Sequence, residues 1–154
     1  MTHPILTKLA KSREALLAAI ADLPEETLDR HPADGWTIRQ VLTHLVNAEE
    51  DHCQVIEVIV RGETDRLPAE FSLDEHNERR VAERARWTRS ELLDALTAQR
   101  RETEALLNRL SADQLALRGR HPVLGEKSVD ELFRIIALHE RMHAQEIAAF
   151  FKPR

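Results

Sequence analysis

Residues 129–151 read VDELFRIIALHERMHAQEIAAFF and contain neither glycine nor proline. Their apolar side chains recur every three or four residues, which is the spacing of one face of an α-helix. The segment therefore predicts a long helix with one buried face, and two histidines interrupt that face. Its members are Leu132, Ile135, Ile136, His139, Met142, His143, Ile147 and Phe150.

Three other segments have the same helical period. We predict the four long helices at Pro4–Leu23, Thr37–Val60, Thr88–Leu110 and Val129–Phe151. All four glycines lie between these segments, as expected for the residue that, after proline, costs most inside a helix. A weaker helix is expected over Leu73–Arg86 and a short one after Ser111.

Helix-start signals agree with this division of the chain. In a capping box, a Ser or Thr side chain and a Glu or Gln three residues later satisfy backbone N–H groups at the helix start. The five matches that precede predicted helices are Thr37–Gln40, Ser72–Glu75, Thr88–Glu91, Ser111–Gln114 and Ser128–Glu131.

The pattern predicts an all-α fold. No segment sustains a period of two, so no sheet is expected. Four amphipathic helices of this length favour a four-helix bundle, and the long connection over residues 61–87 can cross the bundle between its second and third helices. We interpret residues 1–154 as a single domain.

Composition excludes several classes of protein. The 154 residues are 42% hydrophobic and 32% charged, which is typical neither of a disordered chain nor of a membrane protein. A net charge of −5 argues against a general nucleic-acid or anionic-membrane surface. No apolar run reaches membrane-spanning length, and residues 1–13 lack the pattern of a signal peptide, so we expect a cytoplasmic protein.

Histidines carry the most chemical information. His139 and His143 are four residues apart and so adjacent on one helix face, where buried imidazoles need partners for both nitrogens. His44 lies on the face of the second predicted helix that also carries Val41, Ala48 and Val55. Together the three would form a three-histidine metal site with an open coordination position, the ligand pattern of a catalytic zinc-type centre.

Two other metal sites use some of the same residues. His139–His143 is a literal H-E-x-x-H, the zincin motif in which Glu140 would be the general base, although no sheet is predicted to align a peptide. The second alternative is a ferritin-like di-iron site built on the E-x-x-H motifs Glu49–His52 and Glu140–His143, with Glu14 and either Glu102 or Glu104 from the other helices.

A third alternative is structural: the buried histidines have satisfied partners inside a bundle that binds another molecule. His52 fits this structural role better than the role of a ligand to the same metal as His44, because eight helical residues separate the two histidines by about 12 Å. We expect Cys53 to be a small buried hydrophobe and Trp36 and Trp87 to be packing anchors. The remaining histidines are expected on the surface, namely His3, His31, His76 and His121.

Two short motifs together resemble the DinB-like family of metal-binding bundles. Gly35-Trp36-Thr37 opens the second helix and is followed by His44, and His139-x-x-x-His143 on the last helix is followed by Gln145. The resemblance extends to the length, the number of helices and the long second connection.

This resemblance implies an up-down-down-up four-helix bundle that holds a divalent metal (zinc, nickel or iron) through His44, His139 and His143. Related members include thiol-dependent S-transferases and a maleylpyruvate isomerase, which use a low-molecular-weight thiol as cosubstrate. Many members are homodimers. The resemblance assigns no residue to a cosubstrate site.

We therefore expect a metal-dependent thiol transferase or hydrolase that acts on a small molecule and has no nucleic-acid or membrane partner. Glu140 is the candidate catalytic base, with solvent exposure or a salt bridge as its alternative. Glu146 shares the face of both metal histidines and is the candidate partner that orients an imidazole. A non-enzymatic metal-binding stress-response bundle and a di-iron protein are the competing functions.

Overall fold

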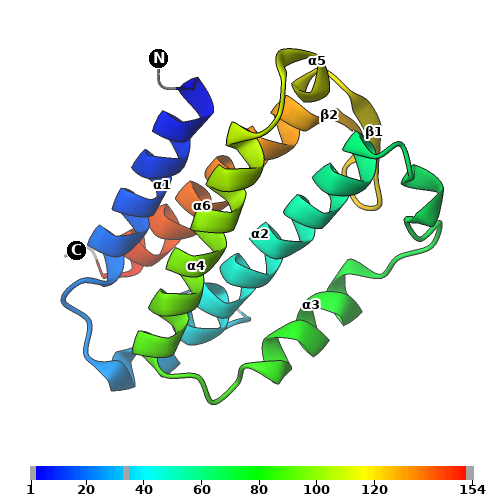
Figure 1. Cartoon of the computed structure of the whole chain (residues 1–154). Helices are drawn as coiled ribbons and strands as arrows, with labels where there is room; N and C mark the ends of the chain where they lie inside the picture. The colour runs from blue at the N-terminus through cyan, green and yellow to red at the C-terminus, as the bar shows by residue number, and fades with distance from the viewer. Residues whose placement is uncertain (1–2, 33–34, 152–154) are drawn as a thin grey trace.

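The structure is a computed structural model that describes residues 3–32 and 35–151. Four long helices form a bundle: α1 (Pro4–Ile20), α2 (Ile38–Val60), α4 (Arg89–Asn108) and α6 (Val129–Phe150). Helices α1 and α6 run in one direction and α2 and α4 in the other (Figure 1). This confirms the expected all-α bundle with up-down-down-up topology. In the described ranges, no helix is both long and apolar enough to cross a membrane.

The predicted capping boxes set the helix starts. Complete boxes, with both hydrogen bonds, begin four helices at Thr37, Thr88, Ser111 and Ser128. At Ser72 only one of the two hydrogen bonds of the capping box forms: the backbone N–H of Glu75 donates to the serine side chain. The predicted starts are therefore accurate, while α1 and α4 end a few residues earlier than expected.

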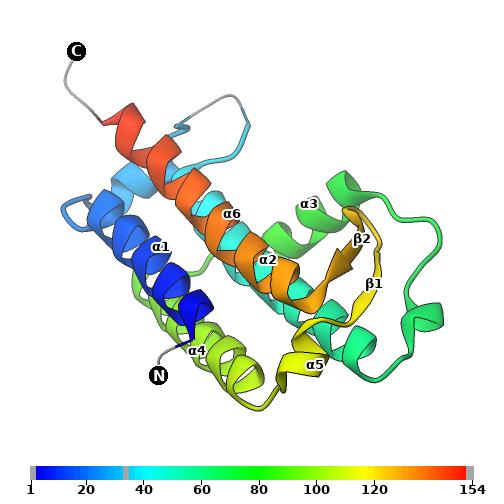
Figure 2. The same cartoon turned by 90° about the horizontal axis from the view of Figure 1, so that it is seen from above.

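The connection between α2 and α4 runs back along the outside of the bundle. It contains a short 3₁₀ helix, η2 (Thr64–Arg66), and α3 (Leu73–Glu83), which lies beside α2 (Figure 2). Arg80 of α3 and Arg84, which follows its last residue, bind Glu50 of α2 and so attach α3 to the bundle. Because α3 brings the chain back to the end of the bundle at which α2 begins, α4 runs parallel to α2.

A small antiparallel hairpin corrects the expectation of no sheet. Strands β1 (Arg118–His121) and β2 (Gly125–Ser128) precede α6, and Gly119 pairs with Lys127. Strands of four residues are too short to show a sustained period of two. A Cβ atom at Gly119 would lie 2.6 Å from Cγ1 of Ile59, so glycine permits this close approach to α2. Two other short helices are the unpredicted η1 (Glu25–Asp29) and the expected α5 (Ala112–Leu115).

The hydrophobic core consists of two clusters, one in each half of the bundle. One cluster packs the start of α1 against the ends of α2 and α4 and the start of α6; among its members are Ile5, Leu9, Ile56, Ile59, Leu106, Leu132 and Phe133. The other packs the opposite ends of the same helices; among its members are Leu16, Ile20, Ile38, Leu42, Leu92, Leu96 and Ile147.

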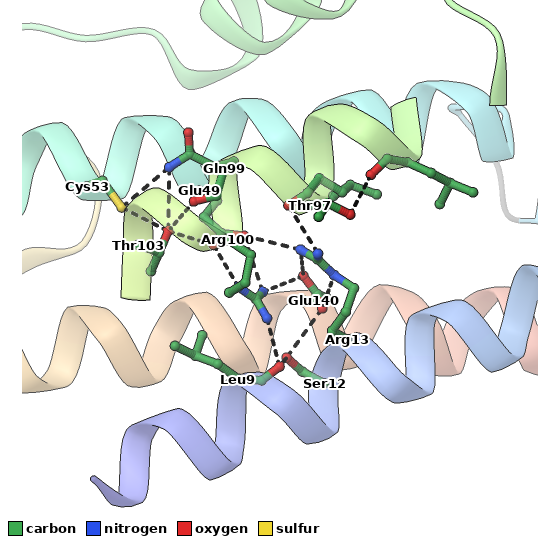
Figure 3. Close-up of polar contacts among 12 residues, drawn as sticks. Leu9, Ser12, Arg13, Glu49, Cys53, Thr97, Gln99, Arg100, Thr103 and Glu140 are labelled. Atoms are coloured by element: carbon green, nitrogen blue, oxygen red, sulfur yellow. Dashed lines mark hydrogen bonds and ion pairs between the residues drawn. The ribbon is translucent and has the colours of Figure 1, made fainter. Parts of the chain in front are cut away.

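A layer of buried charge lies among the four helices (Figure 3). The Arg100 guanidinium donates to the carboxylates of Glu49 and Glu140, at 2.9 and 2.8 Å, and to the carbonyl of Leu9 at 2.7 Å. Arg13 donates to Glu140 at 3.1 and 3.2 Å. Two positive and two negative charges from α1, α2, α4 and α6 thus neutralise one another away from water.

This charge layer makes a stability prediction. Arg100→Met should lower the free energy of unfolding by about 3–5 kcal/mol, because it leaves two buried carboxylates with a single guanidinium. Urea denaturation followed by circular dichroism measures the change. The matched control is Arg101→Met, an exposed neighbour on the same helix, which should change stability by less than about 0.5 kcal/mol. Equal midpoints for the two variants would contradict the proposed role of the layer.

Candidate metal centre

Helices α2 and α6 bring His44, His139 and His143 together. The Nε2 atom of His139 lies 3.1 Å from Nε2 of His44 and 3.2 Å from Nε2 of His143. One nitrogen from each ring can be chosen so that all three lie within 4.8 Å of one another. No other cluster of at least three potential ligands occurs in the part of the chain that the structure describes. The predicted triad thus exists as a spatial group, and its role as a ligand set remains a prediction.

Local sequence explains how each ring is placed. Because His139 and His143 are four residues apart on α6, they lie on one face of the helix, and their rings meet edge to face with centroids 4.7 Å apart. His44 is only 9% exposed and faces the same point from α2. The ring of Trp36 packs against His44 with a centroid distance of 4.7 Å, so the Gly35-Trp36-Thr37 motif supports the third ligand.

Burial keeps these imidazoles neutral. Loss of hydration, together with repulsion between the neighbouring rings, lowers the pKa of His44 to about 3 and that of His139 to about 4. The pKa of His143 is also lowered by burial, although the Glu146 carboxylate opposes the shift. Near neutral pH each ring therefore has a free nitrogen lone pair, which is what a metal ligand requires.

The geometry fits a single divalent ion. In a tetrahedral site with metal–nitrogen distances of about 2.0–2.1 Å, the ligand nitrogens lie roughly 3.3 Å apart, close to the two contacts at His139. The Nδ1 atoms of His44 and His143 are buried and make no hydrogen bond in the described structure. Three neutral imidazoles suit zinc, iron or nickel. These residues can therefore hold such an ion through their Nε2 atoms.

Glu146 is placed where an orienting carboxylate would lie. Its Oε2 atom is 3.5 Å from Nδ1 of His143, on the side of the ring away from Nε2. Carboxylates in this position fix the orientation of a ligand imidazole and raise its basicity. The geometry agrees with the expected role of Glu146.

Glu140, the predicted base, lies elsewhere. Its side chain is almost completely buried, and its carboxylate accepts hydrogen bonds from Ser12, Arg13 and Arg100. The structure therefore favours the salt-bridge alternative, and it leaves the H-E-x-x-H segment without a free base beside the histidines. Sequence analysis missed Arg100. The sequence pattern that could have revealed Arg100 is a charged residue within the apolar stripe of α4 that also carries Leu92, Leu96 and Leu107.

The arrangement required by the di-iron alternative is not present. Glu49 binds Arg100 and Thr103, and Glu140 binds the same arginine. Glu14 and Glu102 are exposed, so neither faces the centre of the bundle. The carboxylates of both E-x-x-H motifs therefore serve the charge layer.

Three histidines expected on the surface are partly or fully buried. His3 is half-buried and caps α1, where its Nδ1 atom accepts a hydrogen bond from the backbone N–H of Ile5. His121 is 8% exposed, and its Nε2 atom lies 3.2 Å from Nδ1 of His52. His76 contacts Asp51 at 2.8 Å. Loops and weakly predicted helices have no periodic pattern that reveals burial, so sequence reasoning could not find these contacts. His31 is exposed, as expected.

The single cysteine is unsuited to nucleophilic chemistry. Burial raises the pKa of the Cys53 thiol to about 11, and its sulfur lies 3.3 Å from the Thr103 hydroxyl. The thiolate is the reactive form, so this thiol is inert near neutral pH. Cys53 is partly buried against the hydrophobic core, slightly more exposed than expected.

Two cavities meet the histidine cluster. One, of about 420 Å³, lies between α2, α3 and the hairpin turn, and His44 and His139 form part of its wall. The other, of about 360 Å³, is bordered by Trp36, His143 and Glu146. The candidate metal centre is therefore accessible to a small molecule.

Comparisons with known proteins agree with the fold and identify the family. The sequence model of the DinB superfamily matches residues 8–147, which confirms the resemblance seen in the sequence. No curated protein sequence matches the chain.

Solved structures share the fold. One is YfiT from Bacillus subtilis, described as a probable metal-dependent hydrolase with an unusual four-helix bundle topology; it is 22% identical, with a TM-score of 0.79 over 95% of this chain and 83% of that one. TT2238, a four-helix bundle protein, is 23% identical, with a TM-score of 0.66 over 94% and 96%. A mycothiol-dependent maleylpyruvate isomerase is 15% identical, with a TM-score of 0.77 over 96% of this chain and 63% of that one.

The lowered histidine pKa values predict that acid destabilises the chelator-treated protein. The unfolded chain binds protons at these histidines near pH 6.5, whereas the pKa of His44 in the folded protein is about 3 and that of His139 about 4. Below pH 6.5 the unfolded state therefore binds more protons, so stability falls between pH 6.5 and 4. The loss approaches about 1.4 kcal/mol per pH unit for each such histidine.

Urea denaturation at several pH values measures this slope. His44→Gln should make it shallower by about 1 kcal/mol per pH unit, because one proton fewer is taken up on unfolding. Met142→Gln is the control, since this exposed position on α6 does not titrate. A slope in His44→Gln equal to that of the unsubstituted protein would show that burial does not depress the His44 pKa.

Proposed function

We propose that this chain, which belongs to the DinB superfamily, is an enzyme that uses one divalent metal ion held by His44, His139 and His143. The proposal rests on one observation above all. Three neutral imidazoles bring their Nε2 atoms to one point, and two of them, His44 and His139, form part of the wall of a cavity large enough for a small substrate. A purely structural site would instead be closed by a fourth protein ligand.

The residues around this point support catalysis more than storage. When bound by three imidazoles, an ion of this kind polarises a substrate oxygen and lowers the pKa of a coordinated water. The Glu146 carboxylate lies 3.5 Å from Nδ1 of His143, and the ring of Trp36 packs against His44, so both contacts would favour one orientation of the ligand rings.

Hydrolysis is the reaction that we favour. Glu140 is ion-paired and the Cys53 thiol is inert near neutral pH, so neither supplies a base or a nucleophile at the site. A nucleophile generated on the metal needs neither group. The description of YfiT as a probable metal-dependent hydrolase supports the same reaction class.

Thiol transfer is the second candidate function. The fold is shared with a mycothiol-dependent isomerase, and an external thiol could be activated at the metal as a water would be. Because Cys53 is buried with a raised pKa, the thiol in such a reaction would have to be a cosubstrate.

Metal content tests the site directly. The purified protein should bind one divalent ion per chain, and His44→Ala or His143→Ala should abolish binding, because each removes one of the three ligands. Glu146→Gln should weaken binding by about 10- to 100-fold. Elemental analysis and competitive titration with a chromogenic chelator provide the measurement.

The control for the ligand variants is His52→Phe, which removes another buried imidazole from the same helix. Its metal content should equal that of the unsubstituted protein. Two irons per chain that depend on His52 would favour the di-iron alternative. Absence of metal from the unsubstituted protein under all loading conditions would refute the proposed centre.

Activity separates hydrolysis from thiol transfer. With zinc bound, the protein should hydrolyse a neutral activated ester such as 4-nitrophenyl butyrate, and His139→Ala should lower kcat/KM by about 100-fold or more. Met142→Ala, an exposed change on the same helix, is the control. Turnover of 1-chloro-2,4-dinitrobenzene that requires an added thiol, without ester hydrolysis, would favour the transferase instead.

A further inference from the structure

The cavity of about 420 Å³ has a composition that limits what can bind there. Most of its wall is apolar and comes from α2, from α3 and the segment before it, from the hairpin turn and from α6. Val58, Leu67, Phe71, Val123, Leu124 and Ile135 provide much of this surface. A ligand that fills the cavity therefore needs a largely apolar body.

The wall contains no group to neutralise an anion. No lysine or arginine belongs to it in the described residues, and its one carboxylate, Asp51, is already bound by His76 and Arg80. A ligand carboxylate would lose its hydration here without gaining a cationic partner, which is strongly unfavourable. Uncharged ligands do not incur this penalty.

One polar group in the wall has a defined direction of hydrogen bonding. The backbone N–H groups of Val123 and Leu124 both donate to Nδ1 of His121, at 3.1 Å. Neutral His121 must then carry its proton on Nε2, and this proton is donated to Nδ1 of His52 at 3.2 Å. Neutral His52 in turn carries its own proton on Nε2.

This relay leaves a free donor at the cavity. Nε2 of His52 makes no hydrogen bond with any residue that the structure describes, and His52 is part of the cavity wall. Burial lowers the pKa of His52 to about 3, so the ring stays neutral near pH 7. The cavity wall therefore combines apolar side chains, no lysine or arginine, and an imidazole whose Nε2 N–H has no partner among the described residues.

We infer that in the metal-free protein this cavity binds an uncharged molecule with an apolar body and a carbonyl-type acceptor, which accepts a hydrogen bond from Nε2 of His52, in preference to a carboxylate of the same shape. Since His44 and His139 belong to the same wall, the molecule would lie beside the candidate metal centre. The inference rests on the proposed function only in naming this molecule as the substrate class.

A matched pair of probes tests this inference. 4-Phenylbutyramide and 4-phenylbutyrate share one apolar body and differ in charge. NMR titration of the chelator-treated protein should give an amide dissociation constant at least about tenfold lower than that of the carboxylate. His52→Phe keeps an aromatic ring but removes the donor, and should weaken amide binding by about tenfold.

A charge-reversal variant makes the test independent of His52. Leu124→Lys adds a cation to the partly exposed wall and should strengthen phenylbutyrate binding by at least about tenfold. Leu138→Lys, on an exposed part of α6 outside the cavity wall, should leave both constants unchanged. Circular dichroism verifies that each variant is folded.

Three results would overturn the inference: equal affinity for the two probes, amide binding that is unaffected in folded His52→Phe, or no binding of either probe. The titration uses metal-free protein, so its outcome is separate from that of the metal analysis. A protein that selects the amide but binds no zinc would support the cavity and refute the metal centre. Zinc binding without a preference between the two probes would support the metal centre and refute the inference about the cavity.

Discussion

The buried ion-pair layer of Glu49, Arg100, Glu140 and Arg13 is the constraint on which the bundle depends. Apolar side chains tolerate sliding of one helix past another, because hydrophobic contact has no direction. Hydrogen-bonded charges do not tolerate it, since a shift of one helical turn, about 5.4 Å, would leave charges unpaired in a medium that does not solvate them. Each of the four long helices contributes one charged member of this layer, so the position of each helix along the bundle depends on the positions of the other three.

The same layer places the histidines. Glu49 on α2 and Glu140 on α6 both reach Arg100, so these two positions lie at similar heights in the bundle. The two helices run antiparallel (Figure 1). The path from Glu49 toward the start of α2 and the path from Glu140 toward the end of α6 therefore lead to the same region, where His44 meets His143. On both α2 and α6, the glutamate therefore lies on one helix face, in the charge layer, and the histidines lie on another face, at the candidate metal centre.

This separation of faces explains what the sequence could predict. Helix positions, capping boxes and the pairing of His139 with His143 follow from local spacing. The agreement in height between His44 and His139 does not, because it is set by an ion pair with Arg100 that connects distant segments. The same limit applies to His121, whose burial depends on a hairpin too short to leave a periodic pattern. The E-x-x-H motifs suggested metal-binding carboxylates because spacing alone does not show that an arginine already occupies them.

Loss of water has opposite consequences in the two polar regions of the bundle. In the charge layer, four ions remain charged because each carboxylate finds a guanidinium. At the cavity no lysine or arginine is available in the described wall, and desolvation instead keeps His44, His52 and His139 uncharged. Neutrality leaves the Nε2 lone pairs of His44 and His139 available to a cation. It also leaves His52 as a donor of one hydrogen bond and gives an anionic ligand no partner in the protein. A single physical cause, dehydration of imidazole without a nearby counter-charge, therefore accounts both for the readiness of the site to bind metal and for the kind of molecule that its cavity admits.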